Sequence, residues 1–471
     1  MNAILAVVMA TAPGVDLRAA VVDARKLDAG TASRTRYLTI SNIPESNRED
    51  VVVVLNFWAN SLSREAEFAK VRRVSPSLVA VVLDDYGWKS ETWEKFAAED
   101  PFYHARIQVE KGARALFWAA GNPLKGAGYA EAVADSAGTL AVPAPWLSQT
   151  DALELSLLTG SAAPLLRGDW WLSRVAIQAG RNGTGYYDFI EVKARADFEK
   201  LVAFDIKESQ RVKKEVAGIV SRSGVANLPR QVFRFQSPTG GYWVTRDALD
   251  DNREGRNALR ALDGDFKHQA EEIYGTLPNG LFVFYLSDEK GVRQDSAPDK
   301  ISSDETAPGR DRRIHVGVSC VRCHVEGLRP VDDWARKVYA GPIKLASPDA
   351  VKFRRLRQIY LGELQEKLTE DVETYTRRLK RLTGKTPEEM AKLVGKVWAG
   401  YVERDLLPAD AAREFGITEA VYLARLKAYF AADQLADPVL ASHLAGIPIR
   451  SDDWEELMPL VAPVALSGGS K

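Results

Sequence analysis

Cysteine is scarce in this chain, whose 471 residues contain only two. A structural zinc site usually draws on two close pairs of ligands, so a single pair leaves such a site short of donors. An excess of one charge is lacking as well, because 63 Lys and Arg stand against 64 Asp and Glu. With a formal net charge of -1, no long-range field indicates nucleic acid as a partner.

Other common signatures of function are absent. The sequence has no Gly-rich loop to cradle a phosphate, no His-Glu-x-x-His metal helix and no Gly-x-Ser-x-Gly nucleophile elbow. No repeat of solenoid period is present. Beyond the first residues, no apolar run reaches the roughly 18 to 20 residues that a membrane-spanning helix needs. The composition is that of an ordinary globular protein, with 46% hydrophobic and 27% charged residues.

What the chain does contain is one pentapeptide that holds both cysteines, Cys320-Val321-Arg322-Cys323-His324. This is the attachment signature of c-type haem. Two thiols at this spacing can add to the two vinyl groups of one porphyrin, and the adjacent imidazole then binds the iron. We therefore predict one covalent haem c per chain, bound through Cys320 and Cys323, with His324 as an iron ligand.

Three alternatives to haem remain for this motif. A zinc site would need His315 or a more distant histidine to complete a tetrahedron. A thioredoxin-type redox pair normally lies where a strand leads into a helix, whereas Gly327 and Pro330 end any helix soon after Cys323. A structural disulfide would close a very short loop, restrict the unfolded chain little and leave His324 unexplained.

The first residues suggest export. Ile4 to Ala10 form a short apolar run followed by Thr11-Ala12-Pro13-Gly14, similar to the hydrophobic part of a secretory signal with cleavage near Ala10 or Ala12. No Lys or Arg precedes the run, and a buried first strand is the alternative. Because bacteria attach haem covalently outside the cytoplasm, the motif favours export. We expect a signal peptide over residues 1–20 and a periplasmic or otherwise exported mature chain without a transmembrane segment.

The periodicity of the remaining sequence predicts an α+β protein in three parts. Residues 21–160 form a mixed N-terminal domain, residues 161–345 a β-rich haem c domain that carries the motif, and residues 346–471 a helical C-terminal bundle. In the first part we expect strands at 35–40 and 78–83 and a helix at 50–62. The aromatic residues that follow are expected to fill a core: Tyr86, Trp88, Trp93, Phe96, Phe102 and Tyr103.

Turn signals predict two hairpins in the middle part. Pro238-Thr239-Gly240-Gly241 separates strand-like residues 232–236 and 242–245, and Pro278-Asn279-Gly280 separates 272–277 from 281–286. A further turn is expected at 288–291. The C-terminal part is expected to hold four or five helices that start at Ser347-Pro348-Asp349, Thr386-Pro387, Thr418 and Asp437-Pro438, with stops at Gly384 and Gly446.

Several segments together resemble a family of exported bacterial proteins with one c-type haem site and no established reaction. The segments are Ser221 to Val225, Phe266-Lys267-His268, Leu277 to Leu281, Ala297 to Ile301, Val318 to Gly327, Tyr86-Gly87-Trp88 and the helical tail. The resemblance implies haem attachment and export and says little about a substrate. Val321 departs from the methionine often found there, but its side chain points away from the thioether bonds, so no loss of haem binding is expected.

The second axial position of the iron has several candidate ligands. His268 ranks first, because it precedes a strong hairpin in the domain of the motif and lies in a segment that carries the resemblance. Met390 and Met458 are alternatives, although both fit the buried side of a helix. His315 could lie at the haem edge, and His104 and His443 belong to other domains. The position can also be open.

Three functions fit a protein of this kind. An electron carrier needs both axial positions filled, a peroxidase-like oxidoreductase needs an open position near acid or base groups, and a redox or gas sensor needs an open or displaceable ligand. We expect a periplasmic one-electron carrier, a monohaem c-type cytochrome, with the haem enzyme and the sensor as alternatives. The large N-terminal part and the helical tail exceed what a bare carrier requires, which argues for partner docking or a further activity. The sequence identifies no redox partner, substrate or oligomeric state.

Overall fold

The computed structural model describes residues 13–102, 104–108, 114–116, 131–133, 139–143, 149–178, 184–211, 215–220, 228–248, 266–297, 303–304, 307, 311–339, 357–360, 362–415, 417–431 and 438–466. The structure is 51% helical and 19% strand, which confirms the mixed α+β class. No helix within the ranges just given is long and apolar enough to cross a membrane.

A four-stranded sheet of order β2-β3-β1-β8 organises the N-terminal part. The strands β1 (Thr35–Thr39) and β3 (Leu78–Val82) pair antiparallel, which confirms both predicted strands. The predicted helix at 50–62 corresponds to α3 (Glu45–Ser61), which begins five residues earlier and has Leu62 as its C-cap. The surrounding elements are β2 (Arg72–Ser75), β8 (Leu165–Arg167), α1 (Pro13–Ala24), α2 (Ala29–Arg34), η1 (Leu83–Tyr86), α4 (Ser90–Ala97), α5 (Gln149–Thr159), α6 (Gly168–Val175) and the short strands β4 (His104–Gln108), β5 (Arg114–Leu116), β6 (Glu131–Val133) and β7 (Thr139–Pro143).

The aromatic cluster of this part is core, as predicted. Trp88 stacks on Tyr86 with ring centroids 4.6 Å apart and meets Phe189 edge to face at 5.1 Å. Five members of the cluster are buried, namely Tyr86, Trp88, Trp93, Phe96 and Phe102, while Tyr103 lies outside the described residues. Burial of large aromatic side chains is a major source of core stability, so these residues stabilise the N-terminal unit.

Two expected boundaries fall inside this unit. The strand β8 begins at Leu165 and pairs in parallel with β1, so the sheet continues past the expected domain boundary at residue 160. The signal-peptide boundary expected after residue 20 falls within α1. That helix buries Leu17 and Val21, and its Asp16 accepts a 2.7 Å hydrogen bond from the Ser77 hydroxyl.

A six-stranded antiparallel sheet of order β14-β13-β12-β11-β10-β9 forms the middle part. Both predicted hairpins are present, since Ser237 pairs with Gly240 at one turn and Thr276 with Phe282 at the other. The predicted turn at 288–291 is present as well, where the Gly291 N–H donates to the Asp288 carbonyl. The strands are β9 (Val216–Val220), β10 (Arg230–Ser237), β11 (Gly240–Asp247), β12 (Ala270–Thr276), β13 (Phe282–Asp288) and β14 (Arg293–Gln294).

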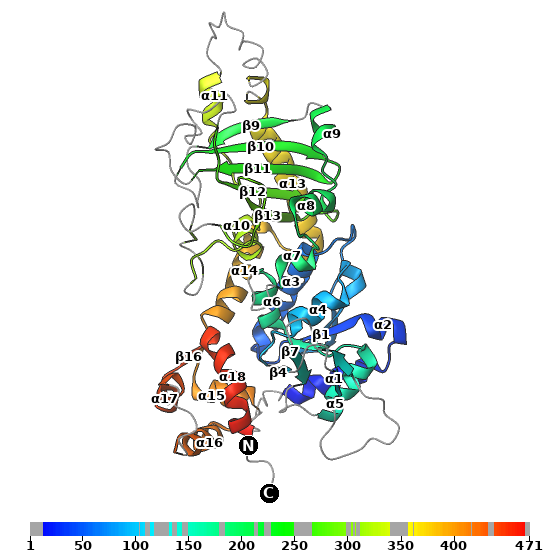
Figure 1. Cartoon of the computed structure of the whole chain (residues 1–471), viewed down its shortest axis with the longest axis vertical. Coiled ribbons are helices and arrows are strands. Elements are labelled where there is room, and N and C mark those ends of the chain that lie inside the picture. The colour runs from blue at the N-terminus through cyan, green and yellow to red at the C-terminus, as the bar shows by residue number, and fades with distance from the viewer. Residues whose placement is uncertain are drawn as a thin grey trace, which may run out of the picture.

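Helices cover both faces of this sheet (Figure 1). Side chains alternate along a strand, so residues paired across strands share a face. On one side, Phe198 of α8 contacts Tyr242 and Tyr285, and we call this side the α8 face. The opposite side carries Tyr274 and Phe284 and is covered by α10 (Val318–His324), so we call it the α10 face. Also in this part are α7 (Tyr186–Phe189), α8 (Arg195–Leu201), α9 (Ile206–Arg211) and α11 (Trp334–Tyr339).

The first described long helix of the C-terminal part, α13 (Leu364–Thr383), packs on the α10 face instead of joining the bundle. Its Asp371 accepts a 2.9 Å hydrogen bond from the Trp243 indole, and its Tyr375 stacks on Phe282 with centroids 4.3 Å apart. The helix ends at Gly384 in the left-handed conformation, as predicted. This helix therefore belongs with the sheet.

Five further helices form the C-terminal bundle in the described part of the chain. The predicted capping box of α14 is present, with mutual hydrogen bonds between Thr386 and Glu389. The predicted starts at Thr418 and Pro438 are confirmed, while the start at Ser347 lies outside the described residues. The elements are α14 (Pro387–Val402), α15 (Pro408–Glu414), α16 (Glu419–Ala431), α17 (Pro438–Leu444), α18 (Ser451–Leu466) and the two-stranded pair β15 (Asp405–Leu406) and β16 (Ile449–Arg450).

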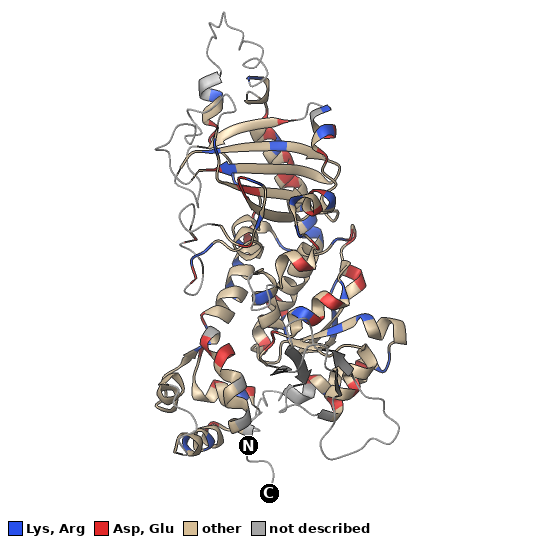
Figure 2. Ribbon diagram, in the orientation of Figure 1, with Lys and Arg blue, Asp and Glu red and all other residues tan. Residues whose placement is uncertain are grey.

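The six-stranded sheet lies at one end of the molecule, and the N-terminal unit and the bundle lie together at the other (Figure 1). A buried ion-pair network joins these last two parts. Arg167 of β8 pairs with Asp169 at 2.8 Å and with Glu414 of α15 at 3.1 Å. Positively and negatively charged residues are interspersed along the described part of the ribbon (Figure 2), in keeping with the near-zero net charge of the chain.

Candidate haem attachment site

The motif Cys320-Val321-Arg322-Cys323-His324 forms most of α10, and a glycine sets the position of this helix. Gly317 precedes it with φ of 88°, a backbone conformation that favours glycine. The next N–H, from Val318, donates to the Ala176 carbonyl at 2.8 Å. A Cβ on Gly317 would lie 2.5 Å from that carbonyl oxygen and 2.6 Å from the Tyr186 ring. The chain therefore enters α10 in close contact with the end of α6 and with α7.

The three side chains of the motif share one face of the helix. Cys320, Cys323 and His324 occupy helical positions i, i+3 and i+4, which lie next to one another on a helix surface. Both thiols are free, Cys320 being buried and Cys323 partly buried. No group of three or more His, Cys, Asp or Glu side chains suited to a bare metal ion occurs among the described residues.

This face packs against strands β12 and β13. The His324 ring meets Tyr274 edge to face at 5.1 Å and stacks on Phe284 at 5.7 Å. Tyr274 and Phe284 are register partners, so they stand side by side on the α10 face. The Cys320 sulfur lies 4.0 Å from a carboxylate oxygen of Glu272, which is two residues before Tyr274 on the same face of β12. The motif therefore has aromatic neighbours at its imidazole and a carboxylate at its first thiol.

Burial determines the protonation state of the motif. It raises the pKa of the Cys320 thiol well above its ordinary value, and the nearby charge of Glu272 adds to this effect. Burial also raises the pKa of Cys323. For His324 burial disfavours the cation and lowers the pKa, so the imidazole is neutral at pH 7. A neutral imidazole keeps the lone pair that a metal ligand requires.

The chain after the motif holds the imidazole in orientation. The His324 Nδ1 lies 3.4 Å from the Gly327 carbonyl, a long hydrogen bond that leaves Nε2 for a ligand. Gly327 has φ of 105°, and a Cβ there would lie 2.9 Å from Val372 of α13. The Tyr375 hydroxyl of the same helix donates to the Val325 carbonyl at 3.1 Å. Two free thiols and an oriented neutral imidazole on one helix face fit the needs of covalent haem.

His268 lies on the other side of the sheet. Its Nε2 is 3.3 Å from a carboxylate oxygen of Glu271, whose side chain also pairs with Arg195 of α8 and Arg246. Glu271 precedes Glu272 in β12, so the two side chains point to opposite faces. Burial alone would raise the pKa of Glu271, but the bond from His268 and the charges of both arginines outweigh it and lower the pKa to about 2. The structure thus directs His268 to the α8 face, away from the motif.

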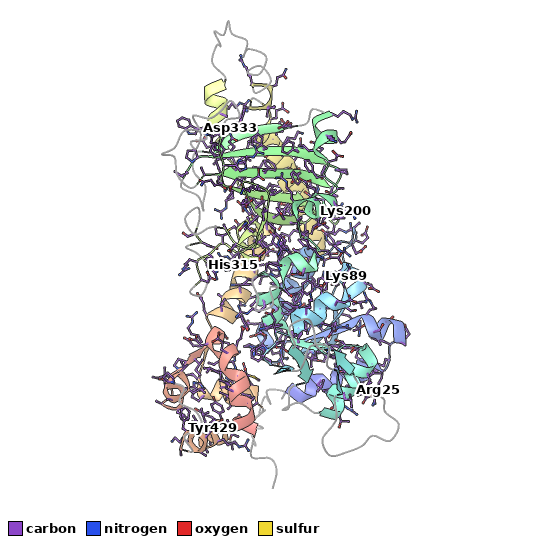
Figure 3. The ribbon with its side chains drawn as sticks, in the orientation of Figure 1. Arg25, Lys89, Lys200, His315, Asp333 and Tyr429 are labelled. Atoms are coloured by element: carbon purple, nitrogen blue, oxygen red, sulfur yellow. The ribbon has the colours of Figure 1, made fainter. Side chains whose placement is uncertain are left out.

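The remaining candidate ligands are dispersed. Met390 is fully buried in α14, a helix that packs against α10, whereas Met458 is buried in α18. His315 lies in the segment before α10 (Figure 3), and its Nε2 is 2.8 Å from Asp311. The His443 Nδ1 lies 3.0 Å from the Ile447 carbonyl in the bundle. The side chain of His104 is outside the described residues.

The residues that surround the motif carry no local signal of their role. The sequence places Glu272, Tyr274 and Phe284 only in the strands of a hairpin, and no motif or turn signal marks Arg230. Their place beside the motif follows from sheet pairing and from the way α10 folds back on the sheet. Alternation within residues 270–276 separates Glu272 and Tyr274 from their neighbours, but it does not say which face α10 covers.

Comparisons with protein-family models, with curated proteins and with solved structures find no match to this chain.

Proposed function

We propose that this protein binds one haem c covalently and transfers single electrons. Cys320 and Cys323 would form the thioether bonds, and His324 would bind the iron. The proposal rests on one observation above all: two free thiols and a neutral imidazole lie at positions i, i+3 and i+4 of one helix, on the same face. The bound group supplies an iron that alternates between the ferric and ferrous states.

The residues around the motif have distinct tasks in this proposal. Tyr274 and Phe284 contact the His324 ring edge to face and by stacking, and so fix the plane of the ring. The Gly327 carbonyl accepts from Nδ1 and directs Nε2 outward. Tyr375 holds the loop after the motif against α13. A packed imidazole changes position little when the iron changes oxidation state, as electron transfer requires.

Met390 is our first choice for the second axial ligand, because its helix packs against α10. Methionine opposite histidine is the ligand pair of cytochromes c and raises the reduction potential. An open position at this site would instead favour a peroxidase-like oxidoreductase or a gas or redox sensor.

Export is part of the proposal, because haem of this type is attached outside the cytoplasm. The apolar run from Ile4 to Ala10 lies outside the described residues. Since α1 starts at Pro13 and contributes Leu17 and Ala20 to the core, we place the cut before this helix. Peptide mass analysis of the secreted chain should give a new N-terminus no later than Pro13. An N-terminus beyond Pro13 would contradict this placement.

The test of haem attachment is expression together with a c-type maturation system. The chain should retain its haem stain in a denaturing gel, and its pyridine haemochrome should report two thioether bonds. The Cys320→Ala, Cys323→Ala double variant should lose the stain. Optical spectra of both oxidation states then distinguish an electron carrier from a haem enzyme or sensor, since the haem of a carrier should be low-spin in both states. Haem stain in the double variant, or stoichiometric zinc without haem in the native protein, would falsify the proposal.

A further inference from the structure

Glu272 brings a carboxylate to the motif from the sheet. Its Oε1 lies 4.0 Å from the Cys320 sulfur. The strand register places it next to Tyr274 on the α10 face, and the ring of Tyr274 contacts His324. The carboxylate of Glu272 is therefore close to the first thioether position, and only the side chain of Tyr274 separates it from the proposed iron ligand His324.

The charge of Glu272 is only partly neutralised. Arg230 makes a two-pronged ion pair with Asp247, with distances of 2.8 and 2.5 Å. Its contact with Glu272 is longer, at 3.5 Å. One guanidinium thus faces two carboxylates, and one negative charge remains on the side of the motif. The side chains of Arg230, Asp247 and Glu272 are 9%, 6% and 14% exposed, so water screens this charge weakly.

Two arginines near the motif oppose this carboxylate mainly at the second thiol, where their charges lower the pKa of Cys323. Arg322 forms an ion pair with Asp304. Arg329 is exposed, so solvent screens its charge.

The charge of Glu272 acts on four groups of the site, Cys320, Cys323, Tyr274 and His324, and its effect on Cys323 is the smallest of the causes at that thiol. After burial, it is the next cause that raises the pKa of the Cys320 thiol. It likewise adds to burial in raising the pKa of Tyr274. At His324 it opposes burial, which lowers the pKa of the imidazole. The carboxylate of Glu272 therefore acts on the Cys320 thiol, the Tyr274 phenol and the His324 imidazole.

We propose that Glu272 is a positioning charge that lowers the reduction potential of the haem bound at Cys320, Cys323 and His324. This inference rests on the proposed function. One electron from a mediator or a partner protein takes the iron–porphyrin unit from a charge of +1 to 0, and no bond is formed or broken. A nearby buried carboxylate stabilises the charged ferric form more than the neutral ferrous form, so reduction becomes less favourable.

The experiment is a mediated redox titration of the haem-loaded wild type and of matched variants. Glu272→Gln removes the charge and keeps the shape, while Arg230 retains its pair with Asp247. Glu272→Met also removes the charge and introduces no polar group that needs a hydrogen-bond partner. It replaces Glu272→Gln in the titration if that variant fails to fold. Glu272→Asp keeps the charge and tests whether shape alone matters. Glu271→Gln is the control, because it removes the neighbouring charge on the opposite face.

We expect Glu272→Gln and Glu272→Met to raise the midpoint potential with unchanged spin state, Glu272→Asp to stay near the wild type, and Glu271→Gln to shift it much less. In the haem-free chain, Glu272→Gln should also lower the pH at which Cys320 is alkylated. An unchanged potential in both charge-free variants, or an equal shift in Glu271→Gln, overturns the role of Glu272. Wild-type protein that carries no haem by the haemochrome assay overturns the proposed function instead, so the two failures are distinguishable.

Discussion

Glu271 and Glu272 are consecutive residues of β12, yet their side chains lie on opposite faces of the six-stranded sheet. Glu271 receives bonds from Arg195, Arg246 and His268 on the α8 face. Glu272 faces the Cys320 sulfur on the α10 face. Glu271 therefore has three cationic or imidazole partners, whereas the charge of its neighbour Glu272 is only partly balanced.

His268→Ala should leave the haem spectrum unchanged. The side chain of His268 contacts Glu271 on the face away from the motif, so its loss exposes no iron position. The free energy of unfolding should fall by about 1 kcal/mol or less, the size of one hydrogen bond. Optical spectra of both oxidation states and the rate of carbon monoxide binding check this. A ferric spectrum that turns high-spin would return His268 to the iron.

Met390→Ala should open the iron site. The variant should turn the ferric haem largely high-spin, remove any near-infrared methionine-to-iron band of the wild type and allow rapid carbon monoxide binding. Met458→Ala is the matched control, since both methionines are buried and each truncation should cost about 2 to 5 kcal/mol of stability. Similar spectral changes in both variants would indicate a general loss of packing and count against Met390 as a ligand.

The strands and most helix starts could be predicted because their signals are local. Turn residues such as Pro278-Asn279-Gly280 set the hairpin that closes with Thr276 opposite Phe282. Thr386 with Glu389 marks the start of α14 through a capping box. The motif itself is equally local, because three side chains at helical spacing need no distant partner to share a face.

The surroundings of the motif could not be predicted, because they depend on contacts between distant segments. Nothing near Arg230 indicates that sheet pairing places it between Asp247 and Glu272. His268 lies on the side of the sheet to which the side chain of Glu271 points. The sequence does not say which side that is, because it does not say which face α10 covers. The place of α13 on the sheet is a further case, since its amphipathic pattern suits a bundle equally well.

Acid should weaken the fold through Glu271. Its pKa in the folded protein is about 2, below the ordinary value of 4.5, so the folded state favours the charged form. The resulting stability is fully present above pH 4.5 and is lost as the pH falls towards 2. The shift corresponds to about 3 kcal/mol. Denaturant unfolding from pH 6 to pH 2.5 should show this loss, and Glu271→Gln should flatten the profile. An equally steep profile in the variant would assign the loss to other carboxylates.

Gly317→Ala should displace α10. The new Cβ would destabilise the fold in two ways. A φ of 88° disfavours any side chain, and the Ala176 carbonyl oxygen would lie only 2.5 Å away. Gly291→Ala separates these effects: it has φ of 77°, and a Cβ there would meet nothing within 4 Å. We expect Gly291→Ala to lower stability by about 1 kcal/mol through backbone strain and Gly317→Ala by several times as much. Thermal unfolding measures the difference, and the haem stain shows whether a displaced α10 still carries the group. Equal losses in the two variants would mean that the contact with Ala176 does not hold the helix in place.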